Sequence, residues 1–249
     1  IVQNASPFAA LAFRFGIVTI GFFLFALLKK DIIFTPLAIP PIPNKEKILD
    51  RFNAPDFYIW WDEETLLGEK ENNNPLGNPQ QWTKNAKQNY PELIDWIETY
   101  IPCDDWYYIR IARAKHEIPP HIDGNAVNPT HKHHLAIMPE TLKYNMDHEP
   151  IGYRFVVAGS KDKMYMCKEH DYTKDMTWQK KHRCIVPEDT DAFLIRNQDQ
   201  AHGVEADTED RLIGFILGKV NAKKHWDLIE KSVSTYSDKV IRKQDVFDA

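Results

Sequence analysis

Residues that could bind a metal ion gather in the middle of the chain. Six of the ten histidines lie between His116 and His148. His121 and Asp123 are two residues apart, and on an extended chain such residues point to the same face, so both can reach one ion. A third ligand must come from elsewhere, and His202 is the best candidate because it follows an apolar, strand-like run and precedes Gly-Val.

Two histidines and one carboxylate on one face leave three open positions on an octahedral iron, the arrangement of non-haem Fe(II) oxygenases. A His-x-Asp pair alone is a weak signal, because it arises by chance in many proteins. Its specificity rises when a strand-flanked histidine follows about eighty residues later, as His202 does here.

Arg211 lies nine residues after His202 and begins the apolar run RLIGFIL. A strand, a polar turn and a return strand would bring Arg211 back beside the metal. A buried arginine is costly unless it meets an anion, and its forked guanidinium suits a dicarboxylate cosubstrate. The alternative is that Arg211 pairs with Glu205, Glu209 or Asp210 in the turn.

Strand-like runs surround these residues between Trp106 and Val220. The runs are short, rich in β-branched or aromatic residues and separated by turn residues: WYYIRIARA, KHHLAIM, GYRFVVAG, KMYMCK, DAFLIRN and RLIGFILGKV. Without helices between them, they predict a mainly β fold, an antiparallel sandwich or barrel of the jelly-roll, cupin-like type, which is a double-stranded β-helix. Arg154 begins one run; we weigh a position facing a substrate against an ion pair on the sheet surface, and the ion pair is the expectation.

Helices are expected on both sides of this β core. Pro91 opens an N-terminal one, with Leu93, Trp96 and Ile97 at helical spacing. Residues 223–243 read as a C-terminal surface helix. The resulting organisation is a hydrophobic segment at 1–30, a proline-rich linker at 31–45, the β domain with its N-terminal helical part at 46–222, and a C-terminal helix at 223–249.

The N-terminal segment contains an uncharged run from Phe15 to Leu28 that two lysines follow. Residues 5–28 are long enough to span a bilayer, although Arg14 would cost roughly 2.5–3.5 kcal/mol near its centre. We weigh a membrane anchor against a packed hydrophobic helix and a cleaved or mistranslated leader. If the segment is an anchor, the lysines place the following domain on the cytoplasmic side of the membrane. The expected location of the domain is cytoplasmic in either case.

Composition limits the function further. The 249 residues are 43% hydrophobic and 27% charged, which suits one full-sized domain with a core. A net charge of −5 gives no basic surface for phosphates, so nucleic acid is not an expected partner. Three widely spaced cysteines form no disulfide framework and favour a reducing compartment.

The stretch from about Tyr107 to Asn221 resembles the aspartyl/asparaginyl β-hydroxylase family of Fe(II)/2-oxoglutarate-dependent oxygenases. The resemblance rests on PPHIDG (119–124), THKHHLAI (130–137), the GYRF strand entry, FLIRNQDQAHGV (193–204) and Arg211. These elements follow the family's order at similar spacing and cover less than half of the chain.

The resemblance implies a set of cofactors and ligands. Fe(II) would be bound by His121, Asp123 and His202, and Arg211 would bind the distal carboxylate of the cosubstrate 2-oxoglutarate. Dioxygen is the other cosubstrate. Some relatives have glycine at the position of Asp123, so this sequence carries the complete triad of the wider superfamily.

Lys132 and His134 correspond in the resemblance to a basic pair that helps to hold 2-oxoglutarate. The family commonly carries arginine in place of Lys132, and lysine keeps the charge but loses the bidentate geometry. Residue parity agrees with the pairing, because Lys132 and His134 would share one face of a strand.

The family's activity would be hydroxylation of the β-carbon of an aspartyl or asparaginyl residue in a peptide or protein. A small molecule or a lipid acyl chain is a further substrate class to consider. Two other classes of function compete: a cupin-type metalloenzyme that does not use 2-oxoglutarate, and a non-catalytic barrel that binds a ligand.

Overall fold

The computed structural model describes residues 31–53, 63–67, 81–114, 117–121, 152–168, 181–196, 200–207 and 211–247. Within these ranges no helix is both long and apolar enough to cross a membrane. The predicted anchor at residues 5–28 and the predicted KHHLAIM strand lie outside them.

The described chain is mainly β, with antiparallel strands and few helices, as the sequence predicts. The strands are β1 (Ile32–Pro36), β2 (Glu63–Thr65), β3 (Cys103–Ala114), β4 (Ile118–His121), β5 (Gly152–Ala158), β6 (Met164–Met166), β7 (His182–Arg183), β8 (Ala192–Ile195), β9 (His202–Val204), β10 (Arg211–Val220) and β11 (Ile241–Arg242). The helices are α2 (Lys45–Asn53), α3 (Lys84–Asn89), α4 (Pro91–Tyr100), α7 (Ala222–Thr235) and α8 (Lys243–Phe247).

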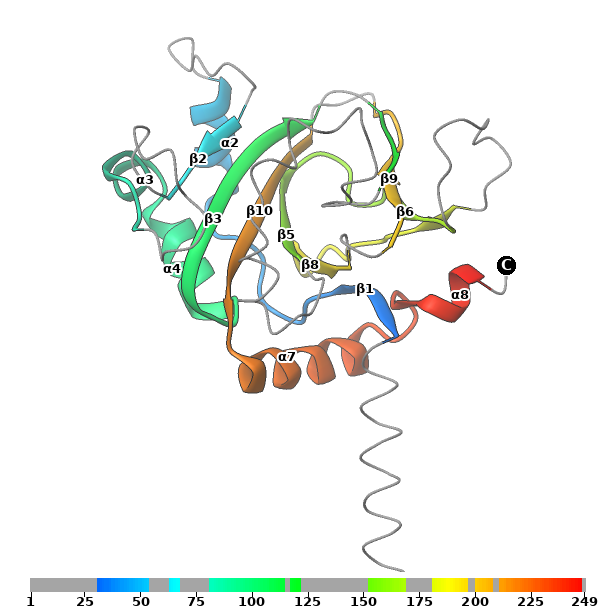
Figure 1. Ribbon diagram of the computed structural model, residues 1–249. Helices are drawn as coiled ribbons and strands as arrows, with labels where there is room; N and C mark the ends of the chain where they lie inside the picture. The colour runs from blue at the N-terminus through cyan, green and yellow to red at the C-terminus, as the bar shows by residue number, and fades with distance from the viewer. Residues whose placement is uncertain are drawn as a thin grey trace, which may run out of the picture.

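The strands form two antiparallel sheets. The larger has the order β11-β1-β8-β5-β10-β3-β2 and the smaller the order β4-β9-β6-β7. From β3 to β10 the chain passes repeatedly between them: β3, β5, β8 and β10 belong to the larger sheet, and β4, β6, β7 and β9 to the smaller. In Figure 1 the long strands β3 and β10 curve toward the side where β9 and β6 lie.

Two apolar clusters define three layers. One cluster joins the larger sheet to the helices and includes Trp96 of α4, Phe155 of β5 and Ile229 of α7. The other lies between the two sheets and includes Phe34 of β1 and Met166 of β6. Figure 1 shows α2, α3 and α4 on the outer side of β3 and α7 beneath the larger sheet. The smaller sheet therefore faces the side of the larger sheet that the helices do not cover.

Helix α4 confirms the helix predicted at Pro91. Proline occupies its first turn, and the side chains at helical spacing, Leu93, Trp96 and Ile97, are buried against the sheet. The C-terminal helix differs from its prediction, because α7 ends at Thr235 and β11 and α8 follow it.

The segment expected to be a proline-rich linker is part of the folded unit. Ile33 and Phe34 are fully buried in β1, which pairs with β8 on one side and β11 on the other. The carboxylate of Asp191 accepts a hydrogen bond from the backbone N–H of Ile42 at 2.8 Å and one from Lys45 Nζ at 2.9 Å. Strand pairing and this buried carboxylate hold the proline-rich chain in place.

Candidate metal centre

His121 and His202 lie side by side on neighbouring strands of the smaller sheet. His121 is the last residue of β4 and His202 the first of β9, and the two are direct partners in the antiparallel register. Their ring centroids are 4.4 Å apart. His202 is buried and His121 is half-buried. Residues 81 positions apart in the chain thus place two imidazoles side by side.

Backbone carbonyls set the proton position on both rings. His121 Nδ1 lies 2.9 Å from the carbonyl oxygen of Pro119, and His202 Nδ1 lies 3.1 Å from that of Gln200. A carbonyl oxygen only accepts, so each Nδ1 donates its hydrogen and the lone pair of each neutral ring is on Nε2. A histidine that binds a metal through one nitrogen usually donates from the other in this way. The pair therefore fits two nitrogen positions around a transition metal.

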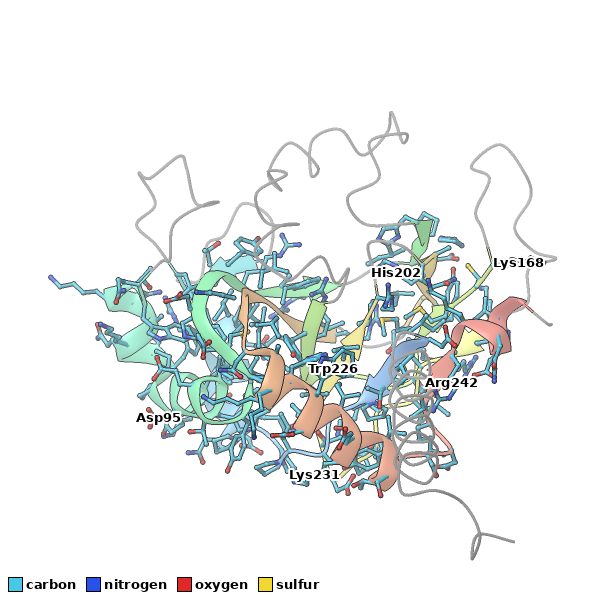
Figure 2. The ribbon with its side chains drawn as sticks, turned by 60° about the horizontal axis from the view of Figure 1, so that its bottom comes forward. Asp95, Lys168, His202, Trp226, Lys231 and Arg242 are labelled. Carbon is cyan, nitrogen blue, oxygen red and sulfur yellow. The ribbon has the colours of Figure 1, made fainter. Side chains whose placement is uncertain are left out.

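Strand register shows which way the two rings point. Met166 of β6 is the partner of His202 and belongs to the apolar cluster between the sheets, with Val156 of β5. Because directly opposed residues of an antiparallel pair share a face, His202 and its partner His121 also point toward the larger sheet. Figure 2 shows His202 in this position, between the strands of the two sheets.

Arg211 comes from the opposite wall of the same interior. It is the first residue of β10, and Ile213, two residues on, is the partner of Val156. Alternation along β10 places Arg211 on the face that looks toward the smaller sheet. Arg211 is 2% exposed, and its Nε has no hydrogen-bond partner within the described residues. Burial lowers the pKa of Arg211 below its ordinary value, and the nearby Asp207 carboxylate opposes that shift.

One of the three acidic residues that the sequence offers as partners for Arg211 pairs with other cations instead. Glu205 lies 2.8 Å from Arg183 Nη2 and 3.6 Å from Lys181 Nζ, both on the β7 side. The other two acidic residues of that alternative fall in 208–210, outside the described ranges. A buried guanidinium at the start of β10 remains suited to an incoming carboxylate.

A second cationic feature was not predicted. Phe215 of β10 is the register partner of Arg110 on β3 and of Arg154 on β5. The two guanidinium carbons lie 4.6 Å and 4.5 Å from the centre of its ring. Arg154 is buried, and it donates from Nη1 to the carbonyl of Tyr153 at 3.0 Å.

Arg110, Phe215 and Arg154 together form a cationic row. Arg154 is buried in this row, which corrects the expectation that it lies on the sheet surface. Residue parity places Phe215 on the same face of β10 as Arg211, so the row faces the interior. The signal in the sequence was a cation with apolar neighbours on both sides within a strand-like run, as in YIRIA and GYRFV.

The remaining predicted site residues, Asp123, Lys132 and His134, lie outside the described residues. Among the residues that are described, no group of three His, Cys, Asp or Glu side chains could hold a metal ion. The described part of the centre thus consists of the histidine pair on the smaller sheet and, on the larger sheet, Arg211 and the cationic row.

Comparisons with known proteins add little to this geometry. No protein-family model matches the chain, and no curated protein does. A solved structure of an oxidoreductase of the 2OG-Fe(II) oxygenase family from Burkholderia pseudomallei aligns with 71% of this chain and 78% of its own, at 8% identity and a TM-score of 0.36. A likeness this low carries no argument about function.

Proposed function

We propose that this protein is an Fe(II)/2-oxoglutarate-dependent dioxygenase that hydroxylates a C–H bond. The observation that carries the proposal is the pair His121 and His202, whose rings are opposed on one face with both Nδ1 atoms donating to backbone carbonyls. Asp123 completes the metal-binding triad in this proposal, because it follows His121 at the spacing that puts both side chains on one face.

The proposal includes closure of the two sheets into a double-stranded β-helix. The alternation of strands between the sheets from β3 to β10 supports it, since this order is expected of a jelly roll. In such a barrel the interior holds the metal and its cosubstrate, and the histidines of β4 and β9 would face Arg211 of β10 across it.

Each residue has a role that its position supports. The Nε2 atoms of His121 and His202 hold the metal, and their Nδ1 hydrogen bonds keep the rings oriented. Arg211 binds the distal carboxylate of 2-oxoglutarate, where burial strengthens the charge-assisted contact. When bound, Fe(II) with 2-oxoglutarate and dioxygen supplies an oxidant strong enough to hydroxylate an unactivated C–H bond, releasing succinate and carbon dioxide. The protein keeps this chemistry away from water.

The proposed substrate is an aspartyl or asparaginyl side chain in a peptide or protein, hydroxylated at its β-carbon. The cationic row of Arg110, Phe215 and Arg154 supports an anionic ligand, because two guanidinium groups and Arg211 face the same interior. Lys132 and His134 are proposed to help hold 2-oxoglutarate. The domain would work on the cytoplasmic side, with residues 5–28 as a membrane anchor and no nucleic-acid partner.

The experiment is an assay of 2-oxoglutarate turnover. We expect the purified protein with Fe(II) and oxygen to form succinate slowly without substrate and faster with an aspartyl peptide that it accepts. His202→Ala should abolish succinate formation, and Gln88→Met, a change at an exposed position of α3, should not. Metal-dependent activity that is indifferent to 2-oxoglutarate would instead support a cupin-type enzyme of another class.

A further inference from the structure

A buried glutamine lies beside the candidate metal centre without any role assigned so far. Gln200 is 3% exposed, and its Nε2 donates to the carbonyl oxygen of Cys167 at 2.5 Å. A buried amide group is costly unless it is hydrogen-bonded. This bond crosses from the residues before β9 to the residue that follows β6.

The Gln200 side chain continues the pairing of β6 and β9 beyond its last backbone pair. Met166 and His202 are the last partners in the register. One residue farther, the N–H of Cys167 donates to the carbonyl of Ala201 at 3.0 Å. The carbonyl oxygen of Cys167 accepts a hydrogen bond from the Gln200 side chain instead of from a backbone N–H. The backbone at positions 200 and 201 is thereby held against β6.

The carbonyl of Gln200 is also the group that orients His202. His202 Nδ1 lies 3.1 Å from it, and His121 Nδ1 lies 2.9 Å from the carbonyl of Pro119. In both cases the acceptor is two residues before the histidine. The pyrrolidine ring fixes φ at Pro119, whereas position 200 has no such restraint and is held by its own side chain.

We propose that Gln200 is a positioning residue for His202. Its side chain holds the backbone at position 200 against β6, so that its carbonyl keeps His202 in the Nδ1–H form with Nε2 turned toward the metal. The part of this inference that concerns metal binding rests on the proposed function. The part that concerns the orientation of the His202 ring does not, because that orientation can be measured in the metal-free protein. Loss of such a supporting contact typically costs 10–100-fold in metal affinity.

Metal affinity is the first test, with Co(II) as an air-stable probe followed by calorimetry. Gln200→Met keeps the length of the side chain and removes the donor, and we expect it to weaken Co(II) binding about 10–100-fold. Gln88→Met makes the same chemical change at an exposed position of α3 and is the matched control, expected to bind within about twofold of wild type. Gln200→Asn keeps the amide but shortens its reach, so it should fall between them and serves if Gln200→Met does not fold.

The second test needs no metal. Long-range proton–nitrogen NMR spectra of the metal-free protein show which ring nitrogen carries the proton, and His202→Ala identifies the His202 signals. We expect His202 to be in the Nδ1–H form in wild type and Gln88→Met, and to be a mixture of forms in the Gln200 variant.

The outcomes separate the two proposals. If the Gln200 variant keeps both the Nδ1–H form and the wild-type Co(II) affinity, Gln200 does not position His202. If wild type binds no Co(II), the metal centre is wrong, and the NMR comparison still decides the role of Gln200.

Discussion

At the residue scale, the candidate metal centre is marked by buried arginine side chains, whose charge ordinarily keeps them out of a protein interior. Arg211 is almost fully buried, and Arg154 is buried beside Phe215. Stacking on an aromatic ring offsets part of the cost of desolvating a guanidinium, by about 0.5–2 kcal/mol for each contact. The remaining cost of burying these guanidinium groups is offset if the interior binds an anion, which takes the place of the lost water.

Replacement of Arg211 tests this directly. Arg211→Met should weaken 2-oxoglutarate binding about 10–100-fold, because a charge-assisted hydrogen bond contributes about 1.5–3 kcal/mol. Co(II) affinity should stay unchanged, because Arg211 is not a metal ligand in the proposal. Calorimetry of 2-oxoglutarate binding to the Co(II)-loaded protein measures the effect.

Arg113 provides the control for that experiment. It lies on β3 as the partner of Leu212, on the opposite face from Arg211, and bonds to Phe52 and Asn53. Arg113→Met should leave 2-oxoglutarate binding unchanged. Equal binding by wild type and Arg211→Met would make Arg211 a structural residue.

At the scale of elements, one buried carboxylate adds to the strand pairing that holds the segment at 31–45 in place. Asp191 is fully buried and contacts Lys45 Nζ at 2.9 Å and Lys161 Nζ at 3.0 Å. It also accepts the N–H of Ile42. These bonds join β1 and the chain after it to the start of β8, which neighbours β5 in the larger sheet.

Removal of that carboxylate should be severe. Asp191→Ala leaves the N–H of Ile42 without its acceptor and removes the buried carboxylate that Lys45 and Lys161 share. We expect a loss of about 3–5 kcal/mol in the free energy of unfolding. Urea denaturation followed by circular dichroism gives the value. Lys47→Met, which removes an exposed ion pair with Glu92, should barely move the midpoint. Similar midpoints for the two variants would show that Asp191 does not anchor the segment.

At the scale of the whole molecule, the N-terminal segment predicts attachment to a membrane. The full chain should sediment with phosphatidylcholine vesicles, whereas a chain that begins at residue 31 should stay in the supernatant and give the circular dichroism spectrum of a folded, β-rich domain. The physical reason is the apolar run at 15–28, which is long enough to enter the bilayer with its flanks. Sedimentation of both chains, or of neither, would contradict an anchor in this segment.

Much of the β core was predictable because its strands carry their own pattern. The runs that become β3, β5, β6, β8 and β10 are apolar or alternating and end in turn residues. Strand β4 was not, because IPPH contains two prolines, and proline cannot donate to a ladder. It is tolerated because β4 is the edge strand of the smaller sheet.

The site was predictable in its residue types but not in its geometry. Spacing could select His121 and His202 as candidates, yet only the β4–β9 register makes them partners. The burial of Arg154 and the bond from Gln200 to Cys167 depend on contacts between distant strands. No local pattern encodes such contacts, because each side chain reads as ordinary in its own segment.

The measurement that tests the central claim most directly is anaerobic and spectroscopic. Fe(II) and then 2-oxoglutarate are added to the protein, and the visible spectrum is examined for the weak charge-transfer band of a 2-oxo acid chelated to ferrous iron. We predict the band in wild type and Gln88→Met, and its loss in His202→Ala. Iron binding without a band would contradict the role of 2-oxoglutarate, and failure of wild type to bind iron would contradict the metal centre itself.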